Sequence, residues 1–335
     1  MEYTKENIGQ VSLDELVDII PGIYSAQDER RSIWDVWLHA NHHAAAISEE
    51  VRKGETGGEL LKEIADFAMW LFTTAYKLRG TIGAKNSRHE TEPETIIRIN
   101  HSYSDLLWNK YPAMCPVCYW RRSKGDRSKE RVPGFERSCD CLLHDVEKRN
   151  QSQKIQHVEA LRAFSNDKRS QKRTRVDDWQ KMFTDIFAAN IRHSRLEDIA
   201  FHLLEEMGEV SDAIVRMYTY KNEEFIPGEP RWRQIWLEEE LADVTSWLFS
   251  LVEKLDLIRR TADEYDKWRY AETIVPRGPI LLSGIIWKRY GLEYLKKFYC
   301  PTCKIPEKCG CEILIVPVDK TVDQLAALVS NVPKV

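Results

Sequence analysis

The sequence predicts an all-α fold, in which two tandem helical-bundle repeats form a pseudo-dimer and each repeat is followed by a small cysteine-rich module. Three observations lead to this prediction. Apolar residues recur every three to four positions in both halves, which is the period of an amphipathic helix. The two halves align with each other in the same order of segments, and each half ends in the same cysteine pattern.

The repeat rests on several matches. At one constant offset, Ile23–Ala26 aligns with Ile186–Ala189, and the alignment continues without a gap from Ile33 and Leu196 onward. After a loop that is shorter in the first copy, three further pairs of segments follow in the same order. They are Glu63–Asp66 with Glu240–Asp243, Trp70–Phe72 with Trp247–Phe249, and Leu107–Tyr111 with Ile286–Tyr290. Because one ordered series contains all of these matches, we interpret the chain as an internal duplication.

The bulk composition is that of a globular protein. The chain has 335 residues, enough for two domains, and its 43% apolar and 30% charged residues exclude a disordered chain. The net charge of -4 favours no particular charged partner. No apolar run approaches the roughly 20 residues of a membrane span, and the first residues lack the apolar segment of a signal peptide. We therefore expect a cytoplasmic protein that has no membrane partner.

These matches divide the chain into six predicted segments. They are a helical domain over 1–112, a cysteine knuckle over 113–145, a basic helical linker over 146–175, a second helical domain over 176–292, a second knuckle over 293–318 and a tail over 319–335. Basic residues gather within the first knuckle segment and in the linker: Arg121, Arg122, Lys124, Arg127, Lys129, Arg131, Lys168, Arg169, Lys172, Arg173 and Arg175. They indicate either a solvated helical surface or a strip that contacts phosphates of nucleic acid or a protein partner.

All eight cysteines belong to the repeated pattern. The first set is Cys115, Cys118, Cys139 and Cys141, and the second is Cys300, Cys303, Cys309 and Cys311. A CxxC turn followed by a second close pair supplies the four thiolates of a closed tetrahedral zinc site. We expect two structural Zn²⁺ ions that stabilise short loops. The alternative is a set of buried or redox-active thiols.

Acidic residues of the second half are predicted to line a helix–helix seam. One helix is expected over Leu196–Tyr218 and another from about Trp236 to Leu255, with an antiparallel return at Ile226–Pro230. On helical wheels, Glu206 and Glu209 of the first helix lie on or beside its apolar stripe.

Glu240 and Asp243 occupy the equivalent angles on the second helix, whereas Glu238 and Glu239 point outward as surface charges. Four carboxylates at one interface repel each other and lose solvation unless cations neutralise them. Oxygen ligands favour Mg²⁺ or Mn²⁺. The alternative is that basic groups such as Lys267 and Arg269 satisfy these acids.

The pattern Glu205-Glu206-x-x-Glu209 followed by Glu240-x-x-Asp243 resembles that of the MazG-type, all-α nucleoside triphosphate pyrophosphohydrolases, relatives of the dimeric dUTPases. The resemblance covers roughly residues 190–270, with an eroded version over 27–80. It implies a helical bundle, usually dimeric or tetrameric, that hydrolyses a nucleoside triphosphate to the monophosphate and pyrophosphate.

Carried over residue by residue, the resemblance implies that Glu206, Glu209, Glu240 and Asp243 bind Mg²⁺. It implies that Glu205 binds metal or orients water, and that the catalytic set includes Lys267 and Arg269 as basic residues of a following helix. Trp247 is expected to be a core residue or to stack on the base.

The first copy departs from the motif, because His43 aligns with Glu206 and Ala46 with Glu209, although Glu63 and Asp66 keep the second pair. We expect one active site, in the C-terminal repeat, and a packing role for the first copy. A site for a softer metal that uses His39, His42 or His43 is the alternative. The competing interpretation of the whole chain is a non-catalytic zinc-containing helical scaffold that binds nucleic acid or a protein partner; action on another phosphoanhydride is a third.

Overall fold

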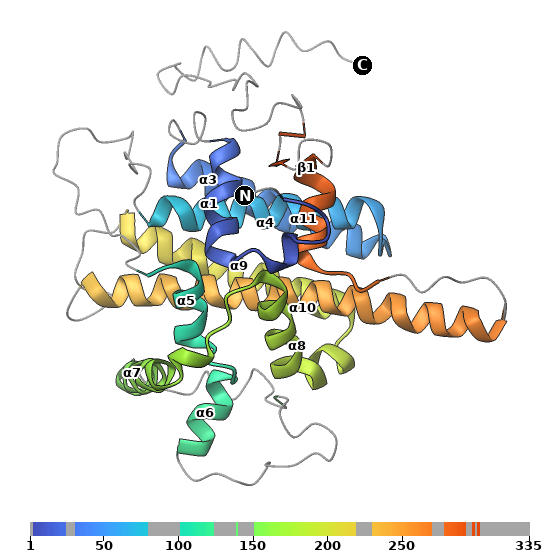
Figure 1. Cartoon of the computed structure of the whole chain (residues 1–335). Coiled ribbons are helices and arrows are strands. Elements are labelled where there is room, and N and C mark those ends of the chain that lie inside the picture. The colour runs from blue at the N-terminus through green and yellow to red at the C-terminus, as the bar shows by residue number, and fades with distance from the viewer. Residues whose placement is uncertain are drawn as a thin grey trace.

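The protein is mostly helical, as predicted (Figure 1). The computed structural model describes residues 3–24, 31–79, 101–123, 139, 151–218, 230–269, 278–292, 297–298 and 300–301. Its elements are η1 (Ile8–Gln10), α1 (Leu13–Ile23), α3 (Ile33–Arg52), α4 (Gly58–Leu78), α5 (Tyr103–Lys110), α6 (Pro116–Ser123), α7 (Gln151–Asp167), η3 (Arg169–Gln171), α8 (Val176–His193), α9 (Leu196–Tyr218), α10 (Pro230–Arg269), α11 (Leu282–Tyr290), β1 (Gly291–Leu292) and β2 (Lys297–Phe298). The two short strands pair antiparallel. None of the described helices is long and apolar enough to cross a membrane.

Local sequence signals explain where several helices begin. Ser32 and Asp35 form a capping box at the start of α3, in which each side chain accepts a hydrogen bond from the other residue's backbone N–H. Ser102 caps α5 by accepting a hydrogen bond from the backbone N–H of Asp105. Helix α10 begins at Pro230, where the missing proline N–H costs no intrahelical bond.

Two long helical pairs form the centre of the molecule. Helices α3 and α4 pack together in the first half, α9 and α10 pack together in the second, and α3 lies against α9 between the halves. One continuous apolar core includes residues from both halves, and the indole of Trp37 on α3 donates a hydrogen bond to Ser211 on α9 (2.8 Å). The halves therefore fold as one body around a shared core.

Positions that the repeat alignment pairs make reciprocal contacts. The backbone N–H of Leu13 bonds to the carbonyl of Thr174 (2.9 Å), and the N–H of Val176 bonds to the carbonyl of Val11 (3.1 Å). Extended toward the N-terminus at the offset of Ile23 to Ile186, the alignment pairs Val11 with Thr174 and Leu13 with Val176, so each hydrogen bond is the counterpart of the other. The starts of α1 and α8 thus meet in a pseudo-symmetric manner.

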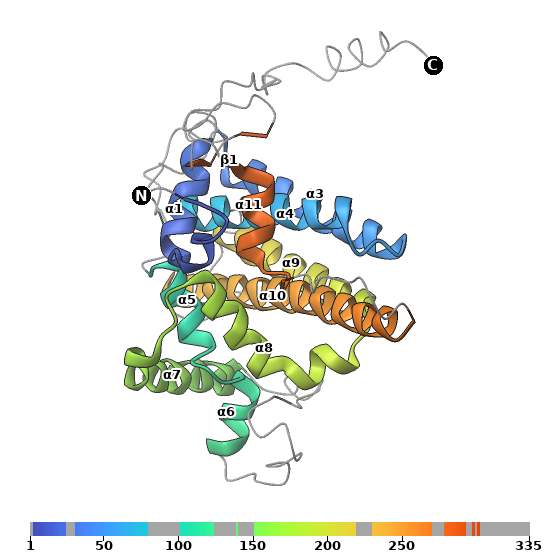
Figure 2. The same cartoon turned by 45° about the vertical axis from the view of Figure 1, so that its right-hand side comes forward.

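The helix that follows each bundle packs on the opposite half. Helix α5 of the first half lies against α10 of the second, and α11 of the second half lies against α4 of the first. Figures 1 and 2 show α5 beside α10, with α11 on the other side of α10, close to α4. This exchange brings residues of the first half to the acidic helix of the second.

Candidate functional site

Three carboxylates from two neighbouring helices converge at one point. Glu206 lies on α9, and Glu240 and Asp243 lie one turn apart on α10. One carboxylate oxygen from each of them lies within 4.8 Å of the other two. Glu209 lines the same cavity but is exposed and lies outside this group of three. The α9–α10 packing therefore gathers the acidic seam that the sequence predicts.

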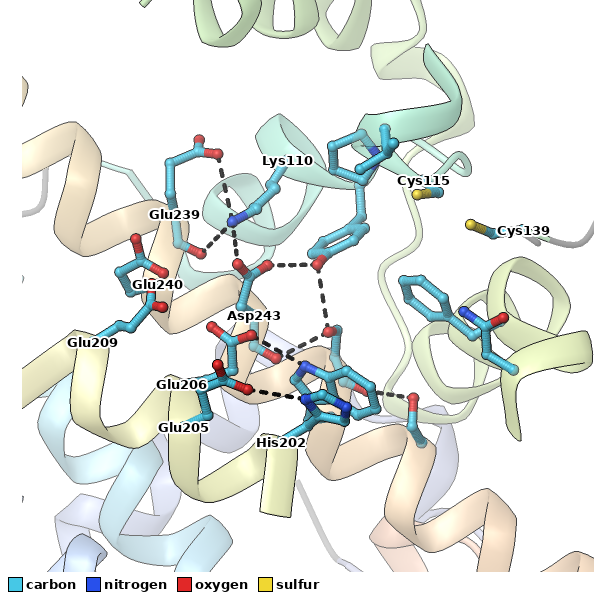
Figure 3. Close-up of a pocket in the computed structure, with 18 of the residues that line it drawn as sticks. Lys110, Cys115, Cys139, His202, Glu205, Glu206, Glu209, Glu239, Glu240 and Asp243 are labelled. Atoms are coloured by element: carbon cyan, nitrogen blue, oxygen red, sulfur yellow. Dashed lines mark hydrogen bonds and ion pairs between the residues drawn. The ribbon is translucent and has the colours of Figure 1, made fainter. Parts of the chain in front are cut away.

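The first half supplies two polar side chains to this cluster. The ammonium of Lys110, at the end of α5, contacts the carboxylate of Asp243 and donates a hydrogen bond to the backbone carbonyl of Glu239 (3.1 Å). The hydroxyl of Tyr111 donates to the other oxygen of Asp243 (2.5 Å). Figure 3 shows Lys110 between the carboxylates of Glu239 and Asp243. Asp243 is thus held by residues more than a hundred positions earlier in the chain.

Burial gives the cluster strongly perturbed acid–base properties. Burial, followed by the charge of Asp243, raises the pKa of Glu206 to about 8. Burial also raises the pKa of Glu240 well above its ordinary value, and the neighbouring carboxylates add to the shift. Burial opposes the charge of Lys110, but the carboxylates of Asp243, Glu239 and Glu240 together raise the pKa of its ammonium above the ordinary value. One ammonium does not compensate the whole group of acids, which favours a bound cation there.

Glu238 and Glu239 are not the surface charges that the helical wheel suggested. Only 1% of Glu238 is exposed, and its carboxylate accepts hydrogen bonds from Arg162 (2.8 Å) and Gln234 (3.0 Å) and pairs with His101 (3.0 Å). The prediction was wrong because Arg162 of α7 and His101, two residues before α5, cover this side of α10, which a two-helix seam leaves open to solvent. Glu239 is mostly buried and lies 3.7 Å from the ammonium of Lys110.

A cavity of about 400 Å³ opens beside the carboxylates, within the usual size range of small-ligand sites. Its acidic lining comprises Glu205, Glu206, Glu209, Glu239, Glu240 and Asp243. Its aromatic lining includes Tyr111, Phe187, Trp236 and Trp247, and Asn190, Ser246 and Ser250 add polar atoms. Helix α7, predicted as a basic linker, contributes Lys154 and His157 to the wall. The acids, aromatic rings and a second lysine thus line one cavity. Figure 3 shows the six acidic side chains with Lys110.

Trp247 connects the aromatic wall to the acidic cluster. Its ring stacks on His202 at a centroid distance of 4.6 Å, and its indole N–H donates to the carboxylate of Glu206 (3.3 Å). Trp247 is partly buried and faces the cavity, so its position is compatible with stacking on a ligand. Glu205 also lines the cavity, but it is exposed and pairs with His202 (3.0 Å) rather than with the group of three.

The positions expected for Lys267 and Arg269 were wrong. Both residues lie on α10 itself, because this helix continues to Arg269 instead of ending near Leu255. Lys267 is therefore about 36 Å along the helix axis from Asp243, at 1.5 Å per residue. Their helix cannot bring them to the cluster of the same chain. Lys110 and Lys154 are the described lysines that line the cavity.

At the equivalent position in the first half, the acidic side chains already form ion pairs with basic residues. His43, Glu63 and Asp66 come together, and His43 pairs with Glu63 (2.7 Å). Arg289 donates two hydrogen bonds to Asp66 (2.8 and 3.0 Å), and the hydroxyl of Tyr290 donates a third (2.5 Å). The alignment pairs Arg289 and Tyr290 with Lys110 and Tyr111, so an Arg–Tyr pair repeats the Lys–Tyr contact.

His39 stacks on Trp70 at a centroid distance of 4.3 Å, as its counterpart His202 does on Trp247. Here, however, two acids are matched by a histidine and an arginine that already bond to them. This arrangement places fewer uncompensated carboxylates in the first half than in the second.

The first cysteine set is partly gathered. The sulfur atoms of Cys115, Cys118 and Cys139 lie within 4.8 Å of one another, and Cys115 and Cys139 are buried. Cys300 is buried as well. The other four predicted zinc ligands, Cys141, Cys303, Cys309 and Cys311, lie outside the described residues.

Comparison of the chain with protein-family models, with curated proteins and with solved structures finds no match. Sequence reasoning missed Lys110, Tyr111 and Lys154. A signal for the first two was present, since Lys110–Tyr111 and Arg289–Tyr290 belong to one pair of matching segments in the predicted internal repeat.

Proposed function

We propose that this protein is a Mg²⁺-dependent nucleoside triphosphate pyrophosphohydrolase of the MazG-like type, with one active site in its C-terminal repeat. The observation that carries the proposal is the convergence of Glu206, Glu240 and Asp243 from two helices inside a cavity of ligand size. Such a cluster, with carboxyl pKa values raised by burial, is typical of a functional site rather than of a solvated helix face.

The donor set fits a hard divalent cation. All three side chains offer carboxylate oxygens, which Mg²⁺ and Mn²⁺ prefer, and Glu209 lies close enough for its charge to act on Glu240. Glu206, Glu240 and Asp243 would hold the metal, with Glu209 as a further ligand. When bound, the metal neutralises phosphate charge and lowers the pKa of a water molecule at the reacting phosphorus.

The residues around the cluster orient the reactants. Tyr111 and Lys110 fix both oxygens of Asp243, which leaves this carboxylate one orientation toward the cavity. Glu205, at the cavity wall, is the proposed acid that orients the attacking water. Water attacks the α-phosphorus, the bond to the bridging oxygen of the β-phosphate breaks, and the products are a nucleoside monophosphate and pyrophosphate.

The cavity also suggests how the substrate lies. Along α10, Trp247 is one turn beyond Asp243, whereas Trp236 is one turn before Glu240. Trp247 and Phe187 offer ring faces for a base. The ammonium of Lys154 lies 5.9 Å from the ring of Trp236, at the other end of the cluster. We place the nucleoside near Trp247 and the terminal phosphates toward Lys154.

We further propose that the chain is a duplicated pseudo-dimer whose first copy has lost its own activity. The exchange of α5 and α11 between halves supports this, because each half depends on the other for the Lys–Tyr or Arg–Tyr pair at its aspartate. The gathered thiols of the first cysteine set support a structural Zn²⁺ there. The proposed second Zn²⁺ site rests on the repeated cysteine spacing.

The scaffold alternative has weaker support. In the described part of the linker, Arg169 and Lys172 both pair with Asp105, so these two cations stabilise the fold instead of forming a phosphate-binding strip. Part of the same linker, helix α7, lines the cavity.

A panel of ribo- and deoxyribonucleoside triphosphates, incubated with the protein and Mg²⁺, tests the proposal by release of pyrophosphate. We expect turnover that requires the metal and is lost in Glu206→Gln and Glu240→Gln. Each variant keeps the size of the side chain, and circular dichroism checks that it folds. Absence of turnover for every triphosphate, together with tight and salt-sensitive binding of nucleic acid, would support the scaffold instead.

A further inference from the structure

The first cysteine set has the geometry of a metal site within the described chain. Tetrahedral zinc with Zn–S bonds of about 2.3 Å separates its sulfur ligands by about 3.8 Å. The sulfur atoms of Cys115, Cys118 and Cys139 all lie within 4.8 Å of one another, so a small closure would bring three thiolates onto one ion. Cys115 immediately precedes α6, Cys118 lies in its first turn, and Cys139 follows 21 residues later in the sequence.

This thiol cluster is part of the wall of the carboxylate cavity. Cys115 and Cys139 line the cavity that also contains Glu206 and Asp243, and Figure 3 labels both sulfur atoms near the end of α5. Cys118 and Cys300 are not among the lining residues. The first cysteine set therefore adjoins the proposed active site, although it follows the opposite repeat in sequence.

A short, strained turn joins the cluster to the residues that hold Asp243. Three residues lie between Tyr111 and Cys115, and the middle one, Ala113, adopts a φ of 55°, in the left-handed region. The N–H of Ala113 bonds to the carbonyl of Tyr111 (2.8 Å). For a residue other than glycine this conformation is unfavourable, and it persists only where its surroundings enforce it. A metal on Cys115 would supply that restraint.

The third thiol ties the cluster to the opposite wall. The backbone N–H of Cys139 bonds to the carbonyl of Ile186 on α8 (2.5 Å). The next residue, Phe187, lines the cavity, and its ring lies 5.9 Å from that of Tyr111. An ion shared by Cys115 and Cys139 would therefore connect the chain that follows α5 with α8. Tyr111 lies between these two segments and would be restrained by both.

We infer that a Zn²⁺ ion held by Cys115, Cys118 and Cys139 is a positioning site that orients Tyr111 and Lys110 for hydrolysis in the C-terminal repeat. The ion touches no substrate and acts through the turn at Ala113 and through α8. The inference rests on the proposed hydrolase function. It gives the first cysteine set a role in positioning active-site residues, beyond the stabilisation that a closed structural zinc site provides.

Two cysteine substitutions in the full-length protein form a matched pair. Cys118→Ser removes a thiol of the cluster without altering the cavity lining, and Cys300→Ser removes a thiol of the second cysteine set. We expect Cys118→Ser to lose zinc and to lower kcat at least about tenfold at unchanged helical content, and Cys300→Ser to stay within about twofold of the wild type. Equal activity of Cys118→Ser and wild type overturns the inference but leaves the hydrolase intact. Absence of hydrolysis by the wild type refutes the proposed function and removes the positioning role with it.

A spectroscopic readout keeps the test valid if Cys118→Ser does not fold. In protein in which Cys300, Cys303, Cys309 and Cys311 are all replaced by serine and Co²⁺ is loaded in place of zinc, the visible absorption reports thiolate ligation in the first set. Addition of Mg²⁺ and a non-hydrolysable α,β-methylene triphosphate should shift these bands, because the cluster adjoins the occupied cavity. A nucleotide that binds, as measured by calorimetry, without any change in the cobalt spectrum would overturn the inference.

Discussion

Replacement of Lys110 by methionine should inactivate the C-terminal site, although Lys110 belongs to the first half. Its ammonium contacts Asp243 and lies 3.7 Å from the carboxylate of Glu239. Unit charges at 3.7 Å attract by about 4 kcal/mol at an effective dielectric constant of 20, and removal of one partner of a buried pair typically costs about 3–5 kcal/mol. Methionine fills a similar volume but leaves Asp243 without its ammonium partner, while Glu239 keeps only the guanidinium of Arg162 (3.6 Å). We expect kcat/KM to fall by about 100- to 1000-fold, comparable with the loss of one group that stabilises transition-state charge.

Arg289→Met is the matched control, because Arg289 makes the equivalent ion pair with Asp66 at the first-half position. It should lower the melting temperature without lowering kcat/KM by more than a few fold. Pyrophosphate release and thermal unfolding, measured on both variants with Mg²⁺, provide the comparison. Equal activity losses in the two variants would refute the view that only the C-terminal site is catalytic, and full activity of Lys110→Met would refute the role of Lys110.

Three further results are expected. Burial, and then the charge of Asp243, raises the pKa of Glu206 from 4.5 to about 8, so the metal-free protein should lose stability as pH rises from about 4.5 to 8. Mg²⁺ should therefore raise the melting temperature more at pH 8 than at pH 5. An equal rise in melting temperature at both pH values would contradict the raised pKa. Trp247→Leu should raise KM about tenfold or more through lost stacking, whereas Trp247→Phe, which keeps a ring, should raise KM only a few fold. Equal KM values for the two variants would show that the base does not stack on Trp247. Lys154→Gln should weaken inhibition by pyrophosphate more than inhibition by the monophosphate. The control Lys181→Gln, at an exposed lysine on α8, should change neither inhibition. Unchanged inhibition of Lys154→Gln by pyrophosphate would show that Lys154 does not contact the terminal phosphates.

The local features of the fold could be predicted from sequence because they depend on near neighbours. The all-α class followed from periodicity and is confirmed, and α9 spans Leu196–Tyr218 as predicted. The wheel positions of Glu206, Glu240 and Asp243 relative to the apolar stripe also depend only on spacing along each helix, and the structure brings these residues together.

The contacts between distant segments could not be predicted from periodicity. Lys110 reaches Asp243 from 133 positions away because α5 packs on the opposite half, and no local pattern encodes that exchange. Glu238 was mistaken for a surface charge because α7 brings Arg162 over it. Lys267 was placed on a following helix, yet no glycine or proline between Leu255 and Arg269 interrupts α10.

The paired substitutions Asp243→Asn and Asp66→Asn, assayed for pyrophosphate release with Mg²⁺ on the best triphosphate of the panel, test the single-site account most directly. Both aspartates occupy equivalent positions, and both accept hydrogen bonds from a tyrosine and contact a basic residue of the opposite half. The account predicts that Asp243→Asn lowers kcat by at least about 1000-fold while Asp66→Asn keeps kcat within about threefold of the wild type. Comparable loss of kcat in both variants, or retained activity in Asp243→Asn, would contradict it.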